Sequence, residues 1–377
     1  MQNPPFCPNA CCRNHLHPEV PDWWRKDGFH ATKTFGSVQR FQCLRCGTSF
    51  SSQTFSVHYF AKCIVNLRAL ERRLSSSMSI RALSRDFKRS CGTILNRIDR
   101  LARQGIALHA HLRPTRNQNE STCYDDLVSF DRSQYFPNNI GISITATSHY
   151  ALGLSHATMR RSGRMSKAQK ARRARIDQKV EFEARAVERS MFSHLSMLQT
   201  ESSPYGSKRT VLVTDKKLEY ERALKIHPLY RGRDAEHQLT HVRVSSKAPR
   251  TVSNPLFASN YFDREVRKDL AQHRRETACF ARNPANGMSR MAVYLVYHNY
   301  EKRYFIKRKE DRKETAAEMA GINPMLIKHL RRSMFSRRAI LSRMELVDID
   351  KAIWEKQVYE PNEGGLHWSK LPRYACA

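Results

Sequence analysis

The feature that most constrains the fold is a short apolar run that ends in an acid, KRTVLVTDKK, at residues 208–217. A continuous run of apolar and β-branched residues is typical of a strand that is buried on both faces of a sheet. We therefore expect a central strand that ends at Asp215. A strand of this kind needs neighbours on both sides, and the surrounding sequence supplies candidates.

Three further strands are expected before this run, because short segments there are rich in β-branched or aromatic residues. They are residues 121–130 (STCYDDLVSF), 139–149 and 150–157. A long basic segment of helix-forming composition follows at about 160–199, within a stretch that ends near residue 205. Beyond the central strand, a strand is expected at 240–247 and a helix from about Tyr261. This order predicts an α/β layer of the ribonuclease-H type.

In a layer of the ribonuclease-H type, one acid lies within the first strand, a second at the end of the fourth strand and a third on a later helix. The sequence offers Asp125, Asp215 and one of Asp263 or Glu265. Adjacent residues of a strand point to opposite faces, so only one of Asp125 and Asp126 can reach a shared site. Asp131 also competes for this role.

Carboxylates in this arrangement suit one kind of chemistry. Two divalent ions about 4 Å apart can activate an attacking oxygen and stabilise a leaving oxygen during phosphodiester cleavage. Magnesium prefers oxygen ligands such as carboxylates, phosphates and water. We therefore expect two Mg²⁺ ions at the acids. The basic residues around them are expected to hold a DNA backbone: Lys216, Lys217, Arg267, Arg274 and Arg275, with His273 on or near the same helical face.

Each of these residues also has an ordinary explanation. Asp215 could cap a turn after its strand, and Asp263 could stabilise a helix N-terminus through the helix dipole. The basic residues could form a solvated face. Only convergence of the acids in space would separate the two interpretations.

Four cysteines near the N-terminus have the spacing of a zinc ribbon. Two short cysteine loops supply the four soft, tetrahedral ligands that zinc prefers, and the flanks RFQC and TSFSS alternate like short strands. The predicted ligands are Cys7, Cys12, Cys43 and Cys46. Cys11 could replace Cys12, and His15 or His17 could replace either. The alternative is a set of free thiols in a small core.

A pair of helices is expected next. Apolar residues recur with helical spacing from Val57 to Leu74, and a second and third helix are expected after Ser79, with Gly92 at the turn between them. Two short helices joined by a tight turn fit a helix-turn-helix, whose second helix enters the major groove of DNA. The residues expected to face outward are Thr93, Asn96, Arg97 and Arg100. The alternative is a helical hairpin with a solvated basic face.

The charge of the whole chain indicates its partner. The sequence has 377 residues and a formal net charge of +31, which attracts polyanions, and nucleic acid is the first candidate. No apolar run is long enough to span a membrane, and no secretory signal is recognised. Clustered cysteines fit a reducing compartment. We expect a cytoplasmic, nucleoid-associated protein with double-stranded DNA as partner and no membrane.

With these motifs in place, residues 1–310 resemble bacterial insertion-sequence transposases of the DDE/DDD class. The resemblance rests on CPN…C with RFQCLRCGTSFSSQT, on RALSRDF…T…NRIDRLARQ, and on YDDLVSFDRSQYFPNN, RRSGRMSKAQKARRA, LVTD, VSSKAPRTVSNPLFASNYFDREVRKDLAQHRRET and FARN…HNY. It implies a ribonuclease-H-like catalytic domain whose acids, Asp125, Asp215 and Asp263, hold two magnesium ions. Many relatives have Glu followed three residues later by Asn, whereas this chain has Asn260 followed by Asp263.

The resemblance also predicts the organisation and activity of the chain. The expected units are a zinc ribbon (1–56), a helix-turn-helix (57–113), a catalytic domain (121–310) and a basic helical tail (311–377). The implied activity is magnesium-dependent DNA cleavage and strand transfer by a dimer or larger assembly. The alternatives are a DNA-binding regulator with a decayed catalytic layer and a nuclease or resolvase that cuts without joining.

Overall fold

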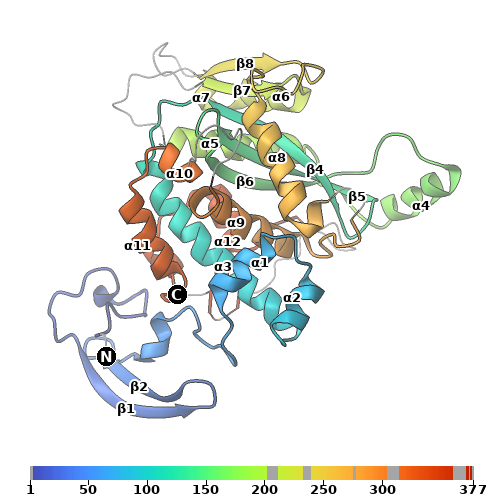
Figure 1. Cartoon of the computed structure of the whole chain (residues 1–377). Coiled ribbons are helices and arrows are strands. Elements are labelled where there is room, and N and C mark those ends of the chain that lie inside the picture. Colours follow the sequence, from blue (N-terminus) through green and yellow to red (C-terminus); the bar gives the residue numbers. More distant parts are fainter. Residues whose placement is uncertain are drawn as a thin grey trace.

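The computed structural model describes residues 3–201, 211–231, 239–274, 277–303, 314–359, 371–372 and 374–375. A small three-stranded sheet at the N-terminus lies beside a larger layered body that contains a five-stranded sheet (Figure 1). The protein is therefore of mixed α/β class in its described part.

The small sheet contains β1 (Trp24–Thr32), β2 (Gly36–Cys43) and β3 (Ser49–Ser51); the large one contains β4 (Thr122–Asp131), β5 (Phe136–Thr145), β6 (Ala151–Thr158), β7 (Val211–Asp215) and β8 (Thr240–Val244). The described α-helices are α1 (Leu67–Leu74), α2 (Ile80–Asp86), α3 (Cys91–Leu112), α4 (Lys167–Asp177), α5 (Ala186–Glu201), α6 (Leu218–Ile226), α7 (Pro228–Arg231), α8 (Phe257–Asp269), α9 (Pro284–Tyr300), α10 (Ala316–Met319), α11 (Pro324–Met334) and α12 (Asp348–Trp354). Short 3₁₀ helices lie at Arg13–His15, Ser52–Phe55, Arg113–Thr115, Ala271–His273 and Leu341–Arg343.

The large sheet has the strand order β6-β5-β4-β7-β8. The first three strands in sequence pair antiparallel, whereas β7 pairs parallel to β4 on one side and to β8 on the other. The expectation of a central strand at Val211–Asp215 is confirmed, as are the strands on both sides of it. The strand β1 was not among the sequence expectations.

The two faces of this sheet carry different helices, and alternation along β4 shows which is which. The hydroxyl of Tyr124 is 3.2 Å from that of Ser190 on α5, whereas the thiol of the adjacent Cys123 donates to the carbonyl of Pro255, just before α8. Because neighbouring strand residues point to opposite faces, α5 and α8 cover opposite faces of the sheet. Figure 1 shows α8 crossing β4 and β7 on the near face.

Helix α3 is the longest described helix and runs through the body rather than over its surface. It packs against α9 so closely that a Cβ on Gly105 would lie 2.9 Å from a methyl carbon of Val296. Its apolar side belongs to one core that extends from Val57 to Val358. The expected second helix of a short pair is thus a 22-residue helix that shares its core with the large sheet.

The helix expected from Val57 begins only at Leu67. The Asn66 side chain accepts a hydrogen bond from the N–H of Ala69 and caps the first turn. Before this cap, Phe60 has a left-handed backbone, with φ of 57°, and Phe60 and Ile64 are exposed. Their apolar spacing suggested a helix, but these two side chains do not face a core.

The C-terminal part returns to the N-terminal elements. On α11, Arg331 donates two hydrogen bonds to the carboxylate of Glu71 on α1, at 2.7 and 2.6 Å, and both side chains are buried. The backbone N–H of Arg338 donates to Phe55, and the N–H of Val57 donates to Ser336. Residues 331–343 therefore join the small sheet to the body.

Replacing Arg331 by Met should lower the free energy of unfolding by about 3 kcal/mol, because the carboxylate of Glu71 would stay buried without its partner. Arg332 on the same helix is exposed, so Arg332→Met should change it by less than about 0.5 kcal/mol. Urea denaturation of the two variants measures the difference. Equal stability would mean that this ion pair does not hold α11 to α1.

Candidate functional site

Four cysteine sulfurs gather at one end of the small sheet. The ligand atoms of Cys7, Cys12, Cys43 and Cys46 all lie within 4.8 Å of one another. The sulfurs of Cys7 and Cys46 are 3.6 Å apart, and those of Cys12 and Cys43 are 3.9 Å apart. A tetrahedron with zinc–sulfur bonds of about 2.3 Å places its sulfurs about 3.8 Å apart. The group could therefore hold a metal ion such as zinc.

The local backbone shapes this cluster. Gly47 follows the second cysteine pair with φ of 71°, and its N–H donates to the carbonyl of Cys43, which closes a tight turn around the sulfurs. The pKa of Cys46 is lowered to about 6: burial opposes the change, but the Thr48 hydroxyl and N–H outweigh it. A thiolate at this position is the form that binds a metal.

The alternative ligands do not reach the cluster. Cys11 is exposed, and so is His17. Both ring nitrogens of His15 are engaged, at 2.7 Å from the carbonyl of Cys7 and 2.8 Å from the hydroxyl of Ser342. The cluster is therefore the one predicted from the spacing, and His15 instead connects it to the C-terminal segment.

Zinc analysis of two adjacent variants tests this assignment. Wild type and Cys11→Ser should each retain about one zinc per chain, whereas Cys12→Ser should lose it, because only Cys12 completes the tetrahedron. Atomic spectroscopy after dialysis against a weak chelator provides the count. Loss of zinc from Cys11→Ser but not from Cys12→Ser would reverse the assignment.

A second candidate site lies on the large sheet, where Asp125 and Asp126 have opposite surroundings. The carboxylate of Asp126 accepts hydrogen bonds from four groups on the α5 and α6 side: the hydroxyls of Tyr124 and Tyr220, the amide of Asn139 and the ammonium of Lys217. The carboxylate of Asp126 therefore has its partners within the protein. Asp125 points to the other face, where α8 lies.

Asp125 and Asp215 occupy corresponding places on neighbouring parallel strands. Cys123 pairs with Val213, and each aspartate lies two residues further along its strand, so both project from the α8 face. Their backbone surroundings are similar: one carboxylate oxygen of Asp125 accepts from the N–H of Asp126, and one of Asp215 accepts from the N–H of Lys217.

Asp263 on α8 completes the set electrostatically. Burial, with the charges of Asp126 and Asp215, raises the pKa of Asp125 to about 7. Burial, with the charge of Asp125, raises the pKa of Asp263 to about 8. The pKa of Asp215 is also raised, mainly by burial. The charge of Asp125 is therefore linked both to Asp215 and to Asp263.

These carboxylates are less closely gathered than the cysteines. Within the ranges that the structure describes, the cysteine cluster is the one group of three or more potential ligands whose atoms lie within 4.8 Å of one another. The acids share a face and influence one another, but they do not form a closed single-ion cage.

Glu265, the other candidate for the third acid, serves a different role. Its carboxylate is buried and binds the ammonium groups of Lys302 and Lys268, the latter at 3.1 Å. Despite burial, these lysines lower its pKa. Of these two acids, Asp263 is the one whose pKa is raised by the charge of Asp125.

Several basic residues expected at DNA have partners within the protein. Lys217 pairs with Asp126 at 2.7 Å, and Arg267 donates to the carbonyls of Val128 and His273. His273 is buried beyond the end of α8, and burial with the charges of nearby arginines lowers its pKa to about 3, so it does not share a helical face with Asp263. The expectation that His273 shares a helical face with Asp263 was therefore wrong. Arg267 does lie on α8 with Asp263, and its charge lowers the pKa of that acid. DNA contacts by Lys217 and Arg267 stay predictions.

The other basic residues have different outcomes. Lys216 and Arg274 are exposed, but Arg274 lies beyond the end of α8 rather than on its face with Asp263. Arg275 lies outside the described residues. Sequence reasoning missed Arg250, whose charge lowers the pKa of Asp263. Its position in the SSKAPRT loop gave no periodic signal.

Two of the α3 residues that were expected to face DNA also point inward. Arg97 donates to the carbonyl of Cys63, and Arg100 donates to the carbonyl of Val57 and lies 3.8 Å from the ring centroid of Tyr374. Both are buried, so the prediction that they face outward was wrong. Asn96 accepts from Arg100, and the hydroxyl of Thr93 is 3.0 Å from that of Ser90 at the helix start. The charged side chains are used to fasten α3 to the preceding loop.

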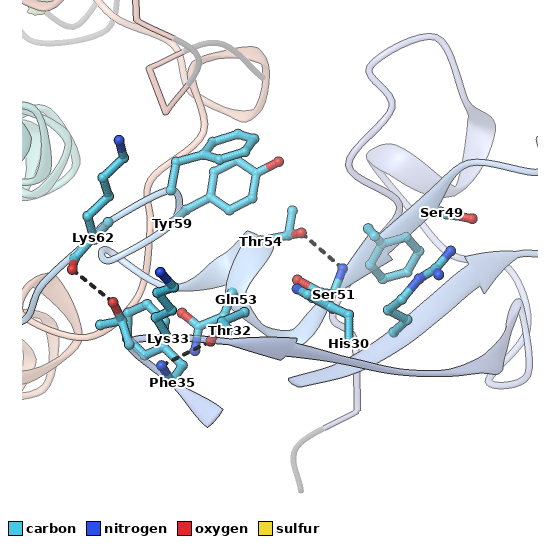
Figure 2. A pocket seen from close by; sticks show the side chains of 15 residues that line it. His30, Thr32, Lys33, Phe35, Ser49, Ser51, Gln53, Thr54, Tyr59 and Lys62 are labelled. Carbon is cyan, nitrogen blue, oxygen red and sulfur yellow. Dashed lines mark hydrogen bonds between the residues drawn. The ribbon is translucent and has the colours of Figure 1, made fainter. Parts of the chain in front are cut away.

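A basic groove separates the small sheet from residues 59–62. It has a volume of about 860 Å³, and Figure 2 shows Tyr59 and Lys62 along one side and Lys33 and Phe35 along the other. None of the residues that line it is acidic. The hydroxyl of Thr34 donates to the carbonyl of Lys62 and ties the two sides together.

The chain matches no protein-family model, and no curated protein matches it. No helix in the described ranges is long and apolar enough to cross a membrane.

Titration of the aspartates gives a prediction for stability. A carboxyl whose pKa is raised on folding favours the folded protein while it is protonated, so that contribution is present below about pH 4 and is lost as the pH rises to about 8. In magnesium-free buffer, Asp263→Asn should therefore raise the melting temperature at pH 9 and leave it almost unchanged at pH 4. A larger gain at pH 4 than at pH 9 would contradict the electrostatic origin of the shift.

Proposed function

We propose that the chain is a DNA transposase that cleaves and transfers DNA strands with two magnesium ions held by Asp125, Asp215 and Asp263. The observation that carries the proposal is the placement of Asp125 and Asp215 at corresponding positions of neighbouring parallel strands, on the face that α8 covers. The charges of neighbouring carboxylates raise the pKa of Asp125 and of Asp263, which agrees with this placement. Carboxylates that repel one another in the absence of an ion gain most when cations bind between them.

Two ions can accept a wider set of carboxylates than one ion can. Ions about 4 Å apart, each about 2.1 Å from its oxygens, accept ligand oxygens that are up to roughly 8 Å apart. A set of carboxylates that share a face without forming a closed cage is consistent with this geometry. The strand order also supports a ribonuclease-H-like layer, because three antiparallel strands are followed by two parallel ones on the side of β4.

When bound, the two ions would activate the attacking oxygen and stabilise the leaving oxygen. In the first step, water adds to a phosphorus at the element end, and the bond to the 3′ oxygen breaks to leave a 3′ hydroxyl. In the second step, that hydroxyl adds to a phosphorus of target DNA and displaces another 3′ oxygen. Asp215 at the strand end and Asp125 beside it would hold the ions against the reacting phosphate, while Asp126 stays paired in the core.

The charge of the chain supports DNA as the substrate. The formal net charge is +31, and exposed basic residues surround the groove beside the small sheet as well as the loops near the acids. We propose that the small sheet, held by zinc, contacts the element end through this groove. Exposed cations on α2 and in the turn after it, Arg81, Arg85, Lys88 and Arg89, replace the inward-facing arginines of α3 as the DNA contacts of the helical pair.

Cleavage of a labelled duplex that carries the element end tests the proposal. Asp215→Asn should bind the duplex with unchanged affinity and lose magnesium-dependent cleavage by more than about a hundredfold, since an amide is a poor magnesium ligand. The exposed, distant Glu345→Gln serves as the control and should retain activity. Undiminished cleavage by Asp215→Asn would exclude this site.

A strand-transfer assay separates the proposal from its nearest alternative. A supercoiled target plasmid and a pre-cut end with a free 3′ hydroxyl should yield joined products. Cleavage without any joining would identify a nuclease or resolvase instead.

A further inference from the structure

Helix α4 projects from the body beyond the ends of β4 and β5 (Figure 1). None of its residues, Lys167–Asp177, is buried. From Arg160 to Lys179 the sequence RRSGRMSKAQKARRARIDQK contains nine Lys or Arg residues and one acid, Asp177. A helix without a buried face and with such a charge imbalance has no core to stabilise it.

Helix α4 and the segment that leads into it are nevertheless held to the body by side-chain contacts. Tyr135, in the turn between β4 and β5, is buried and has the guanidinium groups of Arg161 and Arg172 over its ring, at 5.0 and 5.2 Å from the centroid. Asp177 binds Arg160 at 2.6 Å and Arg173 at 3.4 Å. These contacts use the side of α4 that faces the body.

The start of the helix is also specified. The Ser166 side chain accepts from the N–H of Gln169, whose own side chain accepts from the N–H of Ser166, which is a complete capping box. Isolated helices shorter than about 12 residues are marginal in water. The capping box and the contacts at Tyr135 and Asp177 set the direction of α4. Repulsion among its cations lowers the stability of the helix.

The outward side of α4 has a regular composition. At 100° per residue, the side opposite Arg172 and Arg173 alternates basic and small residues, and all of them are exposed: Lys167, Ala168, Lys170, Ala171, Ala174 and Arg175. The alanines let the helix backbone approach a surface closely, and the three cations alternate with them around this side, with Lys167 between Ala174 and Ala171. This is the arrangement expected of a helix that lies in the major groove of DNA, which is about 12 Å wide, with cations at the phosphates on each side.

We propose that α4 is a DNA-binding arm whose outward face docks on double-stranded DNA beside the acidic site. Its contacts are to phosphates, so binding through it is independent of sequence. The proposal rests on the proposed function only in taking DNA as the partner, and it does not require catalysis by the aspartates.

The geometry places this contact at a defined distance from the acids. Asp131 is six positions beyond Asp125 along β4, and at about 3.3 Å per residue the two are roughly 20 Å apart. With one base pair per 3.4 Å, a duplex that follows β4 meets α4 about 6 base pairs or more from the acidic site. The arm thus holds DNA that flanks the reacting phosphate.

Salt dependence of DNA binding tests the arm directly. The triple variant Lys167→Gln, Lys170→Gln and Arg175→Gln removes the three outward cations and leaves the contacts at Tyr135 and Asp177 intact. Each lost phosphate contact should reduce the slope of log K against log salt by about 0.9, so the slope should fall by roughly 2 to 3. The probe is a 30-base-pair duplex of arbitrary sequence, measured by fluorescence anisotropy.

A matched control removes the same charge elsewhere. Lys328→Gln, Arg332→Gln and Lys351→Gln alter three exposed cations on α11 and α12 and should leave the slope close to that of wild type. If the arm variant and this control bind alike, the proposal is overturned. Circular dichroism and zinc content confirm that both variants are folded.

The outcomes separate this inference from the proposed activity. An altered slope in the arm variant, with a wild-type chain that never cleaves DNA, would support the arm and contradict the transposase. Cleavage by wild type, with an unaltered slope in the arm variant, would support the transposase and contradict the arm.

Discussion

The buried carboxylate of Asp126 is the interaction on which the geometry of the acidic site depends. Four donors hold it on the α5 and α6 side of the sheet, including Lys217 from the turn that follows β7. This network fixes β4 against β7 at the point where Asp215 ends its strand. Because strand residues alternate, fixing Asp126 inward directs Asp125 to the opposite face. There the charge of Asp215 raises the pKa of Asp125, and the charge of Asp125 raises the pKa of Asp263.

The sequence predicted this part of the fold well for a physical reason. A buried parallel strand such as Val211–Asp215 is a continuous apolar run, and the strands beside it show clear β propensity. Likewise, cysteine spacing restricts metal geometry, so Cys7, Cys12, Cys43 and Cys46 could be chosen before their positions were known. Local chemistry determined these features.

Local sequence patterns could not predict which side chains bond to partners far away in the sequence. Arg97 and Arg100 looked like surface cations, yet backbone carbonyls of residues more than thirty positions away receive their hydrogen bonds. The sequence likewise did not indicate that Lys217 pairs with Asp126 or that Glu265 pairs with Lys302. The C-terminal segment was predicted as a basic helical tail, but its sequence did not indicate that Arg331 bonds Glu71 or that the backbone of Arg338 bonds Phe55. Charge alone did not reveal whether a cation faces DNA or a buried carboxylate.

The central claim is that Asp125, Asp215 and Asp263 share divalent cations. Electron paramagnetic resonance of Mn²⁺, an oxygen-preferring substitute for Mg²⁺, measures this most directly. We predict about two bound Mn²⁺ ions per chain when a DNA duplex is present, and a reduced number in Asp125→Asn. A wild-type chain that binds no Mn²⁺, or a variant that binds as many ions with the same affinity, would contradict the account.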